Sequence, residues 1–285
     1  MAVAFADPGE LVDLARAADD SGWHGLTVSD HIVYLRDLQS RYPYTEDGRP
    51  GWEPDTSWPD PWVTIGALSA VTTRLHFTTN VYVAPLRDVV TAAKAVATAA
   101  VLSGNRVSVG VAPGWCAEEF ALTGQDFATR GKRLNEMIPV MRALWSGDWT
   151  ARDGAHVSFP DLKISPVPDE PVPIYVGGDT SVALRRAARL ADGWIGTLYT
   201  PDDAEAKVAE LTGYLADEGR AGDDFEIVLS LLARDSADLF AHMEGLGVTG
   251  IIHAPWMMAR PADGQSPLDA REAEIRRFAE EFIAP

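Results

Sequence analysis

Cysteine is almost absent from this chain, and so are other features that would assign it to a particular class. The 285 residues include a single cysteine, Cys116, which excludes an internal disulfide framework. Basic residues are few, 24 against 42 acidic ones, and the net charge of −18 argues against nucleic acid or an anionic membrane as partner. Since neither a long apolar span nor a cationic-then-apolar signal segment is present, we expect a cytoplasmic protein.

Signatures of several common sites are missing too. No GxGxxG occurs with an acidic residue at the required distance, so a Rossmann nicotinamide site has no support. The histidines other than His31 are scattered without metal-ligand spacing, and we expect no metal site. Nothing indicates a basic partner for Cys116, so a buried structural thiol is a better interpretation than a nucleophile.

The composition that remains is typical of a globular protein with a large core. Hydrophobic residues make up 46% of the chain, and no stretch resembles a linker or a low-complexity segment. A length of 285 residues suits one α/β barrel of about 250 residues. We therefore expect a single domain over residues 1–285.

Residues 75–120 give the clearest structural pattern. Residues 75–83 alternate β-branched and aromatic residues with polar ones and predict a strand. Asp88 can cap a helix that Gly104 ends. Residues 106–111 predict a second strand, and a further helix begins soon after it. A strand, a crossover helix and a strand joined by short loops indicate a right-handed parallel βαβ unit.

Strands and helices continue to alternate along the rest of the chain. Residues 3–5 allow at most a very short first strand, and residues 146–171 predict an excursion with a hairpin around Asp153-Gly154. The other expected strands are 25–29, 173–176, 193–197, 225–231 and 249–253, and the expected helices are 9–21, 61–71, 130–145, 180–191, 202–218, 236–246 and 268–282. This alternation predicts a (β/α)8 TIM barrel, with an open doubly wound sheet as the weaker alternative.

An insertion follows the second expected strand. Residues 32–60 have neither helical nor strand periodicity, yet they include several aromatic residues: Tyr34, Tyr42, Tyr44, Trp52 and Trp58. The insertion starts at the carboxyl end of a strand, where parallel barrels carry their chemistry. We interpret it as a lid over the site, with a flexible surface loop or an oligomer contact as alternatives.

Two short motifs could carry chemistry. His31, beside Asp30, follows a strand and can exchange a proton near neutral pH, although a histidine that caps a loop would look the same. Gly177 and Gly178 directly precede an expected helix, where backbone N–H groups can bind a phosphate or simply form a turn.

Four motifs together resemble a known family. They are SDH at 29–31, VLSGNRVSVGVAPGWCAEEF at 101–120, YVGGDT at 175–180 and LADGWIGT at 190–197. In this order they resemble the luciferase-like monooxygenase superfamily, and within it the bacterial oxidoreductases that use the deazaflavin coenzyme F420. The stretches YPYTEDG at 42–48 and PDPW at 59–62 look more like the F420 group than like its FMN-dependent relatives. The resemblance implies a bacterial-luciferase-like barrel with an insertion after strand 2 and a shortened strand 1.

The resemblance also implies the residues of the site. Asp30 and His31 would lie near the reacting edge of the deazaflavin ring, where His31 would take or give the proton that accompanies hydride transfer. Asn80-Val81 would form a non-prolyl cis peptide that buttresses the ring, whereas the residues themselves indicate only a strand. The implied cofactor contacts are Asp30, His31, Thr79, Asn80, Val81, Ala112, Gly114, Glu118, Val176, Gly177, Gly178, Gly196 and Thr197, with the phosphate at the two glycines.

We therefore expect an oxidoreductase that transfers hydride between F420 and a small organic substrate. Related sugar-phosphate dehydrogenases have a catalytic glutamate at the position of Trp115, which favours an apolar wall here instead. The alternatives are an FMN-dependent two-component monooxygenase with a separate flavin reductase, or a non-catalytic flavin- or deazaflavin-binding protein. A homodimer is implied by the resemblance only, and the substrate and the direction of hydride transfer stay open.

Overall fold

The structure, a computed structural model that describes residues 1–283, is built on a curled parallel sheet. Its strands are β1 (Gly25–Val28), β2 (His76–Thr79), β3 (Val107–Val111), β6 (Ile174–Gly177), β7 (Gly193–Tyr199), β8 (Glu226–Leu231) and β9 (Gly250–Ile251). They pair in that order, and every pairing is parallel. The predicted α/β class is confirmed, with seven strands in the sheet where eight were predicted.

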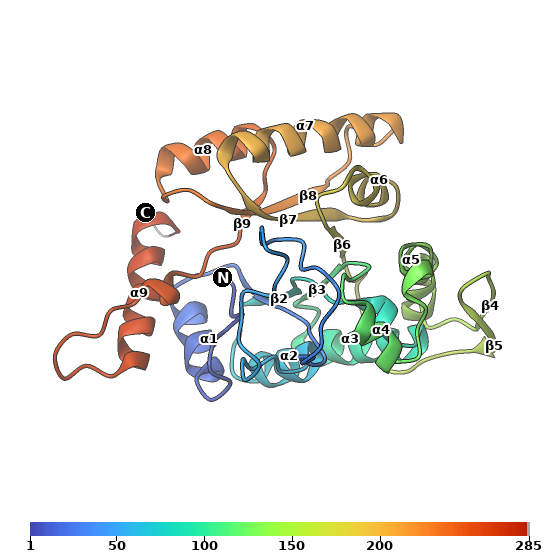
Figure 1. Ribbon diagram of the computed structural model, residues 1–285, viewed down its shortest axis with the longest axis horizontal. Helices are drawn as coiled ribbons and strands as arrows, with labels where there is room; N and C mark the ends of the chain where they lie inside the picture. The colour runs from blue at the N-terminus through green and yellow to red at the C-terminus, as the bar shows by residue number, and fades with distance from the viewer. Residues whose placement is uncertain (284–285) are drawn as a thin grey trace.

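Helices surround this sheet. They are α1 (Leu11–Asp20), α2 (Pro61–Ser69), α3 (Val89–Ser103), α4 (Ala117–Leu122), α5 (Arg130–Trp145), α6 (Ser181–Leu190), α7 (Pro201–Asp217), α8 (Ala237–Gly245) and α9 (Pro267–Phe282), with 3-10 turns η1 (Ala84–Leu86), η2 (Phe127–Thr129) and η3 (Pro255–Met258). Figure 1 shows α7 and α8 along the upper side of the sheet, and α1, α2 and α3 below it. None of the helices within residues 1–283 is long and apolar enough to cross a membrane.

The central βαβ unit forms as the sequence predicts. The Asp88 carboxylate accepts hydrogen bonds from the N–H groups of Val90 and Thr91, both at 3.0 Å, and so caps α3. Gly104 ends the helix in the left-handed region at φ 67°. The strand predicted over 75–83 is shorter in the structure, because β2 ends at Thr79. The peptide bond between the next two residues, Asn80 and Val81, is cis.

Residues 1–3 form a backbone link rather than a strand. Ala2 forms an isolated parallel bridge with Thr27 of β1, and its N–H donates to the carbonyl of His253, just beyond β9, at 2.8 Å. The N–H of Thr27 donates to the Met1 carbonyl at 2.8 Å. The chain turns away at Phe5, whose φ of 69° is incompatible with a strand, so too few residues remain for a ladder. The short first strand that we expected over 3–5 does not form, and the bridge lies at Ala2 instead.

The core lies between the sheet and the helices. Trp194 and Phe77, on β7 and β2, are fully buried in it. Trp23, which follows α1, stacks on Phe278 of α9 with ring centroids 5.0 Å apart, and its indole N–H donates to the carbonyl of Ile275 at 3.2 Å. These contacts join the first helix to the last.

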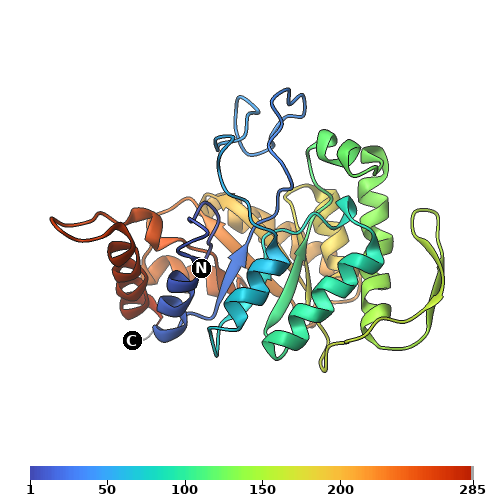
Figure 2. The same cartoon turned by 90° about the horizontal axis from the view of Figure 1, so that it is seen from below.

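Two excursions leave the sheet. The predicted hairpin is confirmed as β4 (Thr150–Asp153) and β5 (Ser158–Leu162), which pair antiparallel. The insertion over residues 32–60 contains turns and bends but neither helix nor strand, as its lack of periodicity predicts. Figure 2 shows this loop projecting above the sheet from the end of β1.

Candidate active site

The predicted site residues lie at one edge of the sheet, because the strands are parallel and their carboxyl ends meet there. They are Asp30 and His31 after β1, Thr79, Asn80 and Val81 at the end of β2, Ala112 and Gly114 after β3, Val176, Gly177 and Gly178 at the end of β6, and Gly196 and Thr197 in β7. Their contacts with a cofactor stay predictions, but the structure brings these residues together at the same end of the sheet.

The turn after β2 is tied to both neighbouring strands. The predicted cis peptide bond between Asn80 and Val81 is present. The Asn80 N–H donates to the Val28 carbonyl at 2.7 Å, and the Ser29 hydroxyl donates to the Asn80 carbonyl at 2.9 Å. On the other side, the buried Thr79 hydroxyl donates to the Gly110 carbonyl at 2.8 Å. The turn is therefore held in a fixed position in the site.

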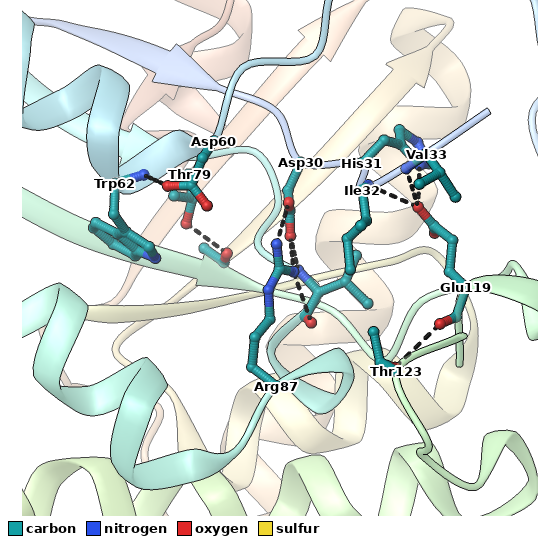
Figure 3. A network of polar contacts seen from close by, with 12 residues as sticks. Asp30, His31, Ile32, Val33, Asp60, Trp62, Thr79, Arg87, Glu119 and Thr123 are labelled. Atoms are coloured by element: carbon teal, nitrogen blue, oxygen red, sulfur yellow. Dashed lines mark hydrogen bonds and ion pairs between the residues drawn. The ribbon is translucent and has the colours of Figure 1, made fainter. Parts of the chain in front are cut away.

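Asp30 is buried in an ion pair instead of offering an open carboxylate. Its two oxygens accept from Nη1 and Nη2 of Arg87 at 2.5 and 2.8 Å, and one of them also accepts the Val83 N–H at 2.9 Å (Figure 3). Burial by itself would lower the pKa of Arg87, but the Asp30 carboxylate outweighs this and raises it. Asp30 therefore fastens the end of β1 to the segment after the cis peptide.

His31 faces a buried glutamate. Its Nδ1 lies 3.5 Å from Oε1 of Glu119, a residue only 3% exposed. The same oxygen accepts the N–H of Ile32 at 2.8 Å, as Figure 3 shows. Burial raises the pKa of Glu119, but hydrogen bonds from the His31 side chain and the Ile32 N–H outweigh it and bring the pKa below its usual value. Glu119 is therefore an ionised partner that orients the imidazole.

Indole rings surround the His31 imidazole. The ring centroids of Trp52, Trp58 and Trp115 lie 4.9, 5.0 and 5.8 Å from that of His31. Trp52 and Trp58 come from the insertion, whereas Trp115 comes from the loop after β3. Tyr42 completes the contact, with its ring 5.1 Å from that of Trp115. The insertion thus lies over His31, and indole rings pack around the imidazole beside the Glu119 carboxylate.

Glu118 holds the insertion against α4. Its Oε1 accepts the N–H groups of Gln39 and Ser40 at 2.7 and 3.0 Å, and the Ser40 hydroxyl accepts the Ala117 N–H at 2.9 Å. Burial opposes ionisation, but these hydrogen bonds prevail and lower the pKa of Glu118 to about 2. The adjacent Cys116 is buried, and burial raises its pKa to about 12, as a structural thiol requires. We predicted a cofactor contact for Glu118, and that contact stays a prediction.

The loop between β6 and α6 contains the two predicted glycines, Gly177 and Gly178. Gly178 has φ 118°, and its carbonyl accepts the Trp194 indole N–H at 2.7 Å. A Cβ on Gly177 would lie 2.7 Å from Cγ1 of Val81, so only glycine allows this close approach to the turn after β2. Thr180 caps α6 and accepts the Ala183 N–H at 3.2 Å, while the N–H groups of the first turn have no partner within the helix.

The end of β7 is irregular. The register with β8 shifts between Gly196 and Tyr199, and Leu198 adopts φ 62°, which is rare for a residue other than glycine. The Tyr199 hydroxyl is buried and has no hydrogen-bond partner among the described residues. Burial, followed by the charges of Asp179 and Tyr44, raises the pKa of Tyr199, so this hydroxyl keeps its proton.

Sequence reasoning missed the roles of Glu119 and Tyr199, and it considered Arg87 only for the acidic tail of F420 and not as the partner of Asp30. A signal existed for Glu119: it lies in the first turn of the expected helix that follows the strand over 106–111, at the same end of the sheet as His31. No local pattern marks the Arg87 ion pair, because Asp30 is 57 positions away, or the burial of the Tyr199 hydroxyl, which depends on the tertiary fold.

These features define a class: an α/β protein with a curled parallel sheet, whose carboxyl edge holds a glycine turn before a helix and an oriented histidine. The chain belongs to the luciferase-like monooxygenase family, whose model matches residues 2–237.

Two relatives illustrate the range of similarity. An uncharacterized protein of Mycobacterium tuberculosis is 36% identical over 286 residues, which cover 99% of this chain and 98% of the relative. The F420-dependent glucose-6-phosphate dehydrogenase of Microbacterium testaceum is 31% identical over 235 residues, which cover 79% of this chain and 63% of that enzyme.

Two solved structures share the fold. The coenzyme F420 dependent tetrahydromethanopterin reductase of Methanopyrus kandleri matches with a TM-score of 0.73 and 14% identity, over 99% of this chain and 96% of that one. The monooxygenase RslO1 of Streptomyces bottropensis matches with a TM-score of 0.72 and 16% identity, over 96% and 92% of the two chains. At such identities the likeness concerns the fold alone.

Proposed function

We propose that this protein is an oxidoreductase that transfers hydride between coenzyme F420 and a small organic substrate. The observation that carries the proposal is His31, held by the ionised Glu119 at 3.5 Å and enclosed by indole rings at the carboxyl edge of the sheet. The similarity to an F420-dependent dehydrogenase supports the choice of cofactor.

The residues at the edge fit a phosphate-bearing deazaflavin. The cofactor's phosphate would contact Gly177, Gly178 and the first turn of α6, where partnerless N–H groups favour an anion. Its ring would rest against the turn at Asn80-Val81. The buried hydroxyl of Tyr199, which has no partner within residues 1–283, provides a hydrogen-bond donor at the same edge. When bound, F420 supplies a ring carbon that accepts or donates hydride.

His31 would move the proton that accompanies the hydride. Its Nδ1 faces the Glu119 carboxylate, which leaves Nε2 as the atom that exchanges a proton with the substrate. Because Glu119 stays ionised, it stabilises the protonated imidazole. The indole rings exclude water and keep the imidazole in place.

The surroundings favour an apolar substrate. Trp115 occupies the loop after β3, Trp52 of the insertion packs on it with ring centroids 6.5 Å apart, and Trp58 packs on Trp52. Large hydrophobic side chains are also exposed near the ends of several strands and in the insertion: Ile32, Val33, Leu198, Leu232, Met257 and Met258. We infer a neutral substrate with an apolar body that is oxidised or reduced at a carbon bearing oxygen or at a conjugated double bond.

The proposal also covers the barrel, the domain and the oligomeric state. The proposed fold is a (β/α)8-type barrel in which residues 1–3, although not a strand, close the seven-stranded sheet, since they hydrogen bond both to β1 and to the carbonyl beyond β9. A single domain over the chain and a homodimer are proposed on the resemblance to the family.

A monooxygenase that uses FMN is the second candidate. It is favoured by the family's own description and by the shared fold with the monooxygenase RslO1. It would need a separate flavin reductase as partner, because the reduced flavin would have to be delivered.

The proposal is tested by single-turnover oxidation of reduced F420, followed by absorbance, against a panel of apolar ketones and conjugated enones. We expect at least one substrate that oxidises F420 with the wild-type protein and fails with His31→Asn. Oxidation of reduced FMN by oxygen with product formation, and no turnover with F420 on any substrate, would favour the monooxygenase.

A further inference from the structure

A groove on the outer surface is lined by three arginines of one helix. It lies between α5, α6 and α7, has a volume of about 330 Å³, and is lined by the exposed Arg185 and Arg189 and the buried Arg186 of α6. Asn135 and Tyr214 form its side walls, and the acidic Asp217 and Glu218 lie at the carboxyl end of α7. The groove is separate from the His31 site.

Arg186 is a buried cation without an anionic partner. Only 6% of it is exposed, its Nε donates to Oδ1 of Asn135 at 2.6 Å, and Nη2 donates to the Gly131 carbonyl at 3.4 Å. No carboxylate lies within 4.0 Å of it in the described part of the chain. A buried charge held only by neutral groups is costly, and a bound anion would relieve that cost.

The other two arginines are also without ion pairs among residues 1–283. Arg185 stacks on the ring of Tyr214, with Cζ 4.2 Å from the centroid, and Arg189 is exposed four residues further along the same helix. Their spacing places both guanidinium groups on one face. In a chain with 42 acidic and 24 basic residues, these three arginines outnumber the two carboxylates that line the same groove, and we call them the cationic track.

The track starts next to the proposed phosphate loop. Val182, in the first turn of α6, lines the groove, and Arg185 and Arg189 follow at intervals of about one turn, so the track extends about 12 Å from the start of the helix. Glu210, which accepts the Ser181 hydroxyl there, is already paired with Lys207 at 3.1 Å. A chain of carboxylates attached beyond a phosphate would reach these arginines.

We propose that this arginine groove binds a chain of carboxylates, supplied by the oligoglutamate tail of F420. The tail follows the cofactor's phosphate, and its side carboxylates can pair with guanidinium groups. This inference rests on the proposed function, because F420 is the molecule that would supply the carboxylates. The groove itself would also accept the carboxylates of a free acidic peptide.

The test compares F420 that carries several glutamates with the glutamate-free form of the cofactor, in wild type and in the double variant Arg185→Gln/Arg189→Gln. Both side chains are exposed, so we expect the variant to fold. We expect wild type to bind the long-tailed cofactor about fivefold or more tightly than the glutamate-free form, with a preference that declines in salt. The double variant should lose that preference and keep its affinity for the glutamate-free form. Arg16→Gln, on α1, serves as control and should behave as wild type.

The other possible results distinguish a failure of the groove proposal from a failure of F420 as the cofactor. Equal affinities for both forms in wild type, or an unchanged preference in the double variant, would overturn the inference although F420 binds. If neither form binds, the proposed function fails, and a fluorescent hexaglutamate peptide then tests the groove by anisotropy. If wild type binds the peptide and the double variant does not, the groove is supported as a site for a chain of carboxylates. If wild type does not bind the peptide, the groove proposal is wrong.

Discussion

Some side chains at the carboxyl edge hold the backbone in place, and others are available for proton transfer. Asp30 and Glu119 are both buried carboxylates, yet Asp30 is saturated by Arg87 and Val83, whereas Glu119 faces an imidazole that can exchange a proton. Sequence reasoning could propose His31 from its position after a strand. It could not predict the ion pair between Asp30 and Arg87, because the two residues are 57 positions apart.

Replacement of His31 by Asn should separate chemistry from binding. We expect turnover with F420 to fall about 100-fold or more, since general acid catalysis contributes about that much, while the cofactor dissociation constant changes little. Stopped-flow absorbance and a binding titration measure the two quantities. Unchanged turnover with intact binding would rule out the proton-transfer role.

Glu119→Gln should impair turnover less than His31→Asn. The amide keeps the shape of the side chain but removes the charge that stabilises the protonated imidazole, so we expect a decrease of about 10-fold at neutral pH. A pH profile of turnover provides the readout, because a purely structural role would lower the rate equally at every pH.

Asp30→Asn should destabilise the fold strongly. The change leaves the Arg87 guanidinium half-buried without its counter-charge, which costs about 3–5 kcal/mol of unfolding free energy. Urea unfolding is the measurement. Asp13→Asn is the control, since its exposed pair with Arg16 at 3.8 Å should contribute less than about 1 kcal/mol. Similar losses for both variants would contradict the structural role of Asp30.

Among the elements, those with local signals were predicted best. The βαβ unit has its cap at Asp88 and its stop at Gly104, and the structure follows both. The insertion has no such signal, and its path depends on distant hydrogen bonds to Glu118 and on rings that pack around His31. Its absence of regular structure was predictable, but its position over His31 was only a hypothesis from the aromatic content.

Acid should release the insertion from α4. The pKa of Glu118 is lowered from 4.5 to about 2 by hydrogen bonds, chiefly from Ser40 and Gln39, that outweigh burial. A lowered pKa means that the anchor stabilises the folded loop fully above pH about 4.5, and that this contribution is lost as the pH falls toward about 2. We expect hydrogen exchange at Gln39 and Ser40 to accelerate across this range, after correction for intrinsic rates. Glu118→Gln should show faster exchange already at neutral pH, and equal protection in both proteins would contradict the anchor.

The loop after β6 offers a steric test of the cofactor site. In Gly177→Ala the new Cβ would meet Cγ1 of Val81 at 2.7 Å, so the loop or the turn after β2 must shift. We expect cofactor affinity to fall about 10-fold or more, since a displacement of this size disrupts a fitted site. Gly213→Ala on α7 meets no atom within 4 Å and should instead stabilise the protein by about 0.5–1 kcal/mol. Binding titrations and thermal unfolding of both variants measure these effects.

For the whole molecule, the alternation of strands and helices predicted the α/β class, and the order of four motifs predicted the family. The start of the fold was the weak point. Residues 1–3 contribute only a bridge, because Phe5 turns the chain away before a ladder can form, so the sheet has seven strands. No sequence pattern specified that hydrogen bonds from Ala2 and Thr27 would link this segment to both neighbouring edges.

The most direct measurement is a fluorescence titration of the purified protein with F420 and, separately, with FMN, using Gly177→Ala as a variant with a damaged site. Our account predicts a dissociation constant for F420 of about 1 μM or lower, at least about tenfold tighter than for FMN, and weakened in the variant. Preference for FMN would contradict the choice of cofactor, and binding of neither would contradict the oxidoreductase itself.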